Sequence, residues 1–183
     1  MGTSLNYIIS QVQGLVDKLH TRNPLDICDA LGIQVLYDDL QRKLKGYYFC
    51  YAEAKVVVID NNVIPLLRPL LIAHELGHAT LHTEIAMMRG FQETDILSID
   101  QPMEYEANLF AAELCLEDDE VIRLLHDYTF FETARILNVP IALLDLKFEL
   151  LKHKGYGLHR QYIAPSDFLK DDIGAYENDS GLY

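Results

Sequence analysis

The amino-acid sequence predicts one α+β domain in which a small sheet is followed by several helices. With 183 residues, the chain has the usual length of a single domain and can bury a stable core without disulfides or structural metal ions. Runs of β-branched and aromatic residues are concentrated between residues 33 and 60. Elsewhere apolar residues recur at three- and four-residue steps, which is the spacing of one helix face.

The N-terminal region predicts two helices. Residues 5–20 carry leucine, isoleucine and valine at helical spacing. Asn23 and Pro24 then begin a second, short helix, because proline is tolerated at the first helical position. Gly32 ends that helix.

Three strands are expected next. Residues 33–37 form the first strand and residues 38–45 a polar turn region. Residues 46–51 and 55–60 read as two strands of a hairpin. We therefore expect a small antiparallel sheet.

The sequence after residue 66 predicts further helices. We place them at residues 67–82, 102–116 and 118–128, and on both sides of Asn138-Val139-Pro140 within 131–152. Residues 83–101 are less periodic and form a connection. We assign residues 1–164 to one domain, with its core at about residues 25–150, and residues 165–183 to an acidic extension.

Net charge and cysteine content indicate which classes of partner and which cellular compartment to expect. The net charge of −13 disfavours binding to nucleic acid or anionic membranes and favours a basic partner. We find no run of apolar residues long enough to span a membrane and no secretory signal. Cys28, Cys50 and Cys115 are odd in number and far apart, which indicates reduced, buried thiols in a cytoplasmic protein.

The main chemical motif is His74-Glu75-Leu76-Gly77-His78, the H-E-x-x-H pattern of zinc peptidases. In a helix His74 and His78 lie one turn apart on the same face, where both imidazoles can bind one Zn²⁺. Glu75 is offset to the side of that pair. It can therefore reach a water molecule at the metal and act as general base without being a ligand.

A catalytic zinc site needs a third protein ligand. The helix predicted at 102–116 offers Glu104 and Glu106 on different faces, so that both cannot bind the same ion. Asn108 shares a face with Glu104 and could hydrogen-bond a ligating imidazole. We expect Glu113 and Glu117 to be solvated surface charges.

His82 continues the face of the motif helix one turn beyond His78. A third ligand at this position would lie about 6 Å further along the helix axis, too far to share the ion. We therefore interpret His82 as a core residue or one that touches a ligand.

These residues resemble the ImmA/IrrE family of metallopeptidases, which are small relatives of the gluzincins. The resemblance rests on His74-Glu75-Leu76-Gly77-His78 with His82, and on the segment from Glu104 to Leu114. It covers about residues 25–150 and implies a zincin-like fold. In gluzincins the third ligand is a glutamate followed four residues later by a polar residue, which selects Glu104 with Asn108. The resemblance thus implies Zn²⁺ held by His74, His78 and Glu104, with Glu75 as the catalytic residue.

Family members of this size resemble the anti-repressors of phages and integrative elements, which cleave a helix-turn-helix repressor encoded beside them. The expected function is therefore a zinc-dependent endopeptidase acting on such a repressor. The main alternative is a zinc-binding module, such as a phage or toxin–antitoxin component, that binds a partner with little protease activity.

Two features remain open in the C-terminal part. Residues 131–152 superficially resemble a helix-turn-helix, with Lys147, Lys152 and Lys154 nearby, but the acidic chain favours a helical pair that closes the core. Nothing in the spacing selects an oxyanion-stabilising residue among the available candidates, which are Tyr156, His159, Arg160 and Tyr162.

Overall fold

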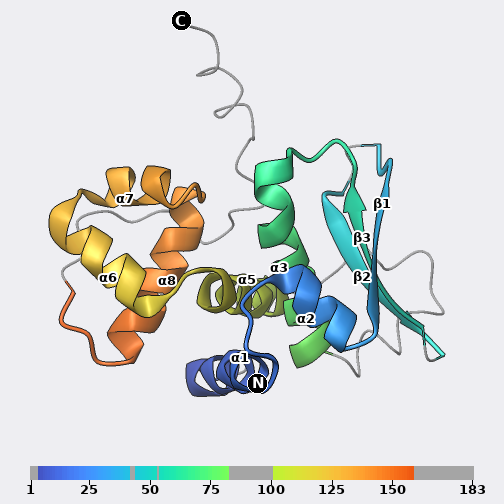
Figure 1. Cartoon of the computed structure of the whole chain (residues 1–183), viewed down its shortest axis with the longest axis horizontal. Coiled ribbons are helices and arrows are strands. Elements are labelled where there is room, and N and C mark those ends of the chain that lie inside the picture. The colour runs from blue at the N-terminus through green and yellow to red at the C-terminus, as the bar shows by residue number, and fades with distance from the viewer. Residues whose placement is uncertain (1–3, 42–43, 53, 83–100, 159–183) are drawn as a thin grey trace, which may run out of the picture.

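A three-stranded sheet lies beside a group of helices in the computed structural model (Figure 1), which describes residues 4–41, 44–52, 54–82 and 101–158. The elements are α1 (Leu5–Leu19), α2 (Pro24–Ala30), β1 (Ile33–Asp38), β2 (Gly46–Tyr51), β3 (Ala54–Asp60), the 3₁₀ helix η1 (Pro65–Leu67), α3 (Arg68–Leu81), α5 (Gln101–Cys115), α6 (Asp118–Asp127), α7 (Phe130–Ile136) and α8 (Ile141–His153). The predicted α+β class is confirmed. The predicted acidic extension and most of the predicted connection lie outside the described residues.

Local capping explains where several helices begin. The side chains of Ser4 and Asn23 accept hydrogen bonds from backbone N–H groups in the first turns of α1 and α2. Thr129 and Glu132 form a reciprocal capping box at the start of α7. Gly32, just after α2, has a φ of 67°, which is a conformation that glycine adopts without a steric penalty. The helix boundaries therefore follow signals that are local in the sequence.

The sheet has the strand order β1-β3-β2. The predicted antiparallel hairpin between β2 and β3 is confirmed, with Tyr51 opposite Ala54. The prediction that the whole sheet is antiparallel is wrong, because β1 pairs with β3 in parallel. The physical reason lies in β3, where four consecutive residues from Val57 to Asp60 are buried. A strand buried on both faces belongs in the centre of a sheet, so β3 separates β1 from β2.

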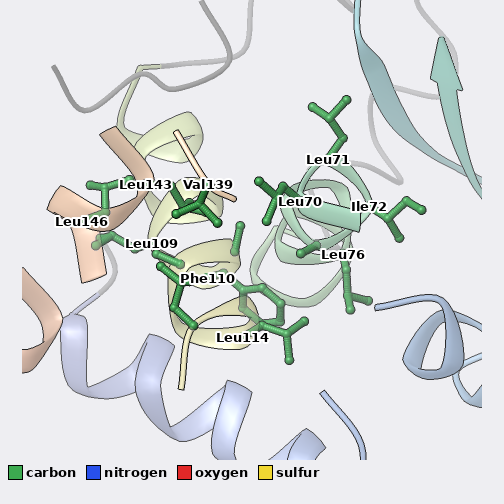
Figure 2. Close-up of a cluster of buried hydrophobic side chains, with 14 of the residues drawn as sticks. Leu70, Leu71, Ile72, Leu76, Leu109, Phe110, Leu114, Val139, Leu143 and Leu146 are labelled. Atoms are coloured by element: carbon green, nitrogen blue, oxygen red, sulfur yellow. The ribbon is translucent and has the colours of Figure 1, made fainter. Parts of the chain in front are cut away.

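Helix α5 lies at the centre of the helical part and contacts α1, α3 and α8. Figure 2 shows Leu70 and Leu76 of α3, Phe110 and Leu114 of α5, and Leu143 of α8 in one cluster of buried side chains. Helix α3 also contacts β2 and β3. Helix α3 is therefore held between the sheet on one side and α5 on the other.

A buried ion-pair cluster joins α5 to the C-terminal helices. Lys147 of α8 is fully buried, and its Nζ lies 2.8 Å from Glu113 Oε2 and 2.6 Å from Asp118 Oδ1. Lys154 pairs with the same two carboxylates. The prediction of a solvated Glu113 is wrong, since a neighbouring helix supplies its cations, whereas Glu117 is exposed as expected. Residues 131–152 form two helices that pack in the core, and two of their nearby lysines neutralise acidic groups of the protein itself.

The three cysteines carry free thiols, as predicted. Cys28 and Cys50 are buried, and burial raises the pKa of the Cys28 and Cys115 thiols to about 12. At neutral pH these two cysteines are therefore protonated, unreactive groups. Among the described helices, none is both long and apolar enough to cross a membrane.

Candidate metal centre

The H-E-x-x-H motif lies in α3, as the sequence predicts, and all three of its polar side chains are buried. Helix α3 follows η1 and carries Pro69 in its first turn, where a missing backbone N–H costs little. One helical turn separates His74 from His78, and their Nε2 atoms lie 3.1 Å apart. The two imidazoles therefore direct the same nitrogen atom towards one point.

Helix α5 brings Glu104 to that point. One carboxylate oxygen lies 3.3 Å from His74 Nε2 and the other lies 3.3 Å from His78 Nε2. Among the described residues, His74, His78 and Glu104 form the one group of three or more His, Cys, Asp and Glu side chains whose donor atoms converge closely enough for a metal ion. The histidines are buried, whereas 34% of the Glu104 side chain is exposed, so this carboxylate is the member of the group that solvent reaches.

The shortest separations between donor atoms of the three residues are close to those of a tetrahedral zinc site. Ligand bonds of about 2.0–2.1 Å at tetrahedral angles place two ligand atoms about 3.3–3.4 Å apart. The two Nε2 atoms lie 3.1 Å apart, and each lies 3.3 Å from a different oxygen of Glu104. An imidazole nitrogen without hydrogen and a carboxylate oxygen are both electron-pair donors, so the arrangement is satisfied by a cation among them. Two nitrogens and one oxygen are also a ligand set typical of catalytic zinc.

Burial and close contact shift the pKa values of all three groups. Burial raises the pKa of the Glu104 carboxyl, but hydrogen bonds with His74 and His78 outweigh it and hold the pKa well below its usual range. Burial lowers the pKa of His78 to about 4. Burial also acts to lower the pKa of His74, but Glu104, Glu75 and Asn108 outweigh it and raise that pKa. The carboxylates of Glu104 and Glu75 thus favour a positive charge on His74, whereas burial disfavours a proton on His78.

Asn108 fixes the orientation of the His74 ring. Its Oδ1 lies 2.8 Å from His74 Nδ1, and both side chains are buried. When the amide oxygen accepts a hydrogen bond from Nδ1–H, the lone pair of the imidazole is on Nε2 and faces Glu104. The contact predicted between Asn108 and a motif imidazole is therefore present.

Glu75 of α3 is buried and faces β2. It lies close enough to His74 and Glu104 for their charges to affect its pKa. Burial raises its pKa to about 7, with a further contribution from Glu104, while His74 and the backbone N–H of Tyr48 act in the opposite direction. A carboxylate with such a pKa is suited to accept and release a proton near neutral pH.

Two glycines beside the site were not singled out by the sequence. A Cβ at Gly46 would lie 3.2 Å from Glu75 Oε1, so a larger residue there would press on the carboxylate. A Cβ at Gly77 would lie 3.1 Å from Ala107 Cα and 3.1 Å from Phe110 Cβ. Gly77 therefore permits the close approach of α3 and α5. The position of Gly77 inside the H-E-x-x-H motif is the sequence signal that could have identified it.

His82 and Glu106 lie next to the converging group. The His82 ring contacts His78, and its Nε2 lies 2.9 Å from Glu106 Oε2. Neither residue belongs to the group of three. Of the candidates for oxyanion stabilisation, Tyr156 is exposed, and His159, Arg160 and Tyr162 lie outside the described residues.

Comparison with known proteins identifies the family. The family model of the IrrE N-terminal-like domain, a peptidase family, matches residues 28–148. The chain is 34% identical over 141 residues to the uncharacterized immunity region protein 2 of Bacillus phage phi105, an alignment covering 76% of this chain and 88% of the phage protein. It is 28% identical over 140 residues to the metallopeptidase ImmA of Bacillus subtilis strain 168, covering 75% of this chain and 81% of ImmA. The chain belongs to the ImmA/IrrE family of metallopeptidases.

Proposed function

We propose that the protein is a zinc-dependent endopeptidase in which His74, His78 and Glu104 hold the metal ion. The observation that carries this proposal is the convergence of three side chains beside a buried Glu75: the two histidine Nε2 atoms lie 3.1 Å apart, and each lies 3.3 Å from one of the two Glu104 oxygens. A zinc ion bound there would supply Lewis-acid chemistry that polarises a peptide carbonyl and makes water more acidic.

Glu75 performs the proton transfers. As the carboxylate it accepts a proton from the attacking water, and as the carboxylic acid it donates that proton to the leaving amine nitrogen. The raised pKa of about 7 makes both forms accessible at neutral pH. The backbone N–H of Tyr48 favours the carboxylate form and fixes its position.

The edge of β2 is suited to align an extended peptide with Glu75. The backbone N–H of Asp60 donates to the carbonyl of Lys45, which makes these two residues a hydrogen-bonded pair of the hairpin. Hydrogen-bonded pairs alternate with non-hydrogen-bonded pairs along an antiparallel ladder, so the backbone groups of Gly46 and Tyr48 point away from β3. The Tyr48 N–H is bonded to Glu75, so it is the groups of Gly46 and the carbonyl of Tyr48 that can face a substrate. An extended substrate can add to such an edge through main-chain hydrogen bonds.

The proposed substrate is a helix-turn-helix repressor of a phage or integrative element. Support comes from the similarity to a protein of a phage immunity region and from the resemblance to anti-repressors. The net charge of −13 adds a physical reason, because an acidic protein attracts a partner whose surface is basic enough to bind DNA.

Metal content tests the site. We expect about one zinc per chain in protein expressed with sufficient metal, and loss of zinc in Glu104→Ala. Glu120→Ala is the matched control, because it removes an exposed glutamate of α6 and should leave the zinc content unchanged. A parent protein that binds no zinc would contradict the proposal.

Cleavage tests the reaction and the substrate. The zinc-loaded protein is incubated with the purified repressor encoded beside it, and products are identified by mass spectrometry. We expect one or a few defined cuts, and at least a hundredfold lower rate for Glu75→Gln at unchanged zinc content. Cleavage by Glu75→Gln at the parent rate would refute its role. A stable zinc-dependent complex without cleavage would instead favour the partner-binding module.

A further inference from the structure

A chain of three buried side chains runs from α5 to the motif helix. The backbone N–H of His82 donates to the carbonyl of His78 at the end of α3, which places the two rings against each other with centroids 5.3 Å apart. His82 Nδ1 lies 3.1 Å from His78 Nδ1. On its other side, His82 Nε2 lies 2.9 Å from Glu106 Oε2. Each of the three residues is 7% exposed, so little water competes for these contacts.

The donor and acceptor groups of Glu106, His82 and His78 determine which ring nitrogen of each histidine carries the hydrogen. An ionised carboxylate can only accept, so His82 Nε2 carries the hydrogen that points to Glu106. In a neutral imidazole, the other nitrogen is then an acceptor, and His82 Nδ1 must accept from His78 Nδ1–H. His78 consequently has its lone pair on Nε2, the atom that faces His74 and Glu104.

We infer that Glu106, acting through His82, is a positioning residue that fixes His78 in the form able to bind the metal through Nε2. The inference rests on the proposed zinc site and adds two residues to its machinery. Without Glu106, His82 can carry its hydrogen on Nδ1 and donate it to His78 Nδ1. That arrangement places the hydrogen of His78 on Nε2 and removes the lone pair that a metal needs.

The same helix thus orients both imidazoles, by different means. Asn108 of α5 contacts His74 Nδ1 directly at 2.8 Å. Glu106, two residues earlier, reaches His78 only through His82. Outer contacts of this kind keep a ligating imidazole in one tautomer and one orientation, and their loss usually weakens metal binding about 10–100-fold.

The first test is the affinity for Zn²⁺, measured by competition with a chromophoric chelator. Glu106→Leu and His82→Phe should each weaken zinc binding about 10–100-fold. Glu106→Gln should remain closer to the parent, because the amide oxygen can still accept from His82 Nε2–H. The double variant should bind zinc no more weakly than His82→Phe alone, since Glu106 acts through His82.

The second test observes the tautomers. Long-range ¹H–¹⁵N spectra of zinc-loaded, histidine-labelled protein should show hydrogen on Nδ1 of His78 and on Nε2 of His82 in the parent. In the metal-free proteins, where no ion fixes the lone pair of His78 on Nε2, the hydrogen of His82 should lie on Nε2 in the parent and shift towards Nδ1 in Glu106→Leu. The control is Glu113→Gln, which alters a buried glutamate of the same helix that pairs with lysines and should change neither the tautomers nor the zinc affinity.

The outcomes separate this inference from the proposed function. Parent protein that binds no zinc would overturn both. Zinc binding by the parent, with Glu106→Leu equal to it in affinity and in the His82 tautomer, would overturn the positioning role alone. Multiplicative effects of Glu106→Leu and His82→Phe would also overturn it, because they would mean that the two residues act independently. Circular dichroism of each metal-free variant identifies any variant that fails to fold; if Glu106→Leu does so, His82→Phe carries the comparison, and its zinc affinity equal to the parent would overturn the inference.

Discussion

The spacing of α3 and α5 should control metal binding, and Gly77→Ala tests this directly. The added methyl group would lie 3.1 Å from Ala107 Cα, 3.1 Å from Phe110 Cβ and 3.2 Å from the Ala107 carbonyl oxygen. Unstrained carbon–carbon contacts lie at about 3.5–4.0 Å. Two of the three neighbouring atoms are backbone, so relief requires α5 to move away by about 0.4 Å.

That movement is large for a metal site and small for the fold. Ligand distances in metal sites hold to about 0.2 Å, and Glu104 moves with α5. We therefore expect zinc affinity to fall at least about tenfold, which corresponds to about 1.4 kcal/mol. For the fold, overpacking costs about 1–3 kcal/mol. The better helix propensity of alanine returns about 1 kcal/mol, so the net loss of stability is about 0–2 kcal/mol.

Two measurements and one control check this reasoning. Zinc affinity comes from chelator competition, and stability from urea unfolding with EDTA present, so that bound metal does not stabilise the folded state by mass action. Gly14→Ala is the matched control, because Gly14 lies inside α1 with no atom within 4 Å of an added Cβ. It should stabilise the protein by about 0.5–1 kcal/mol and leave zinc binding unchanged. Zinc binding by Gly77→Ala at the parent affinity would refute the link between helix spacing and the site.

Three further results are expected. Asn108→Ala should weaken zinc binding about 10–100-fold in the same competition assay, because His74 loses the contact at Nδ1; unchanged affinity would rule out this role. Lys147→Ala should lower the free energy of unfolding by about 3–5 kcal/mol in urea, because two carboxylates lose a fully buried partner; a change below about 1 kcal/mol would contradict that. For Asp118, burial acts to raise the pKa, but Lys147 and Lys154 outweigh it and the pKa is lowered from 3.8. Its stabilisation is therefore present above pH 3.8 and lost as the pH falls through the lower, folded value, so parent and Asp118→Asn should differ by about 1–3 kcal/mol at pH 7 and converge in acid.

The helices and the common face of His74 and His78 could be predicted because their signals are local, whereas the choice of Glu104 over Glu106 came from the resemblance to gluzincins. Capping residues and periodic apolar positions mark most helices within one or two residues of their observed ends. The four-residue spacing of His74 and His78 fixes their common face. The same spacing relates Glu104 to Asn108, and both turn out to contact the motif histidines.

The features that the sequence did not reveal depend on contacts between distant segments. The parallel pairing of β1 follows from the central place of β3, which no residue of β1 encodes. In the sequence Glu113 resembles a surface glutamate. In the folded structure it is buried against Lys147 of α8, which lies 34 residues further along the chain. In each case the partner lies on another element, so the side chain's environment is determined by packing.

Glu106 shows how this limit extends to function. It lies two positions after Glu104, which directs it to another side of α5, away from the proposed metal position. That same direction leads it to His82, one turn beyond His78 on α3. Glu106 and His82, neither of which lies at the proposed metal position, therefore contact each other. His82 in turn contacts His78 at Nδ1. With the proposed metal site, the pattern H-E-x-x-H-x-x-x-H with E-x-E-x-N can be understood physically as two ligand imidazoles with Glu104 between them. Asn108 of α5 contacts one imidazole at Nδ1, and His82, which Glu106 of α5 contacts, meets the other at Nδ1.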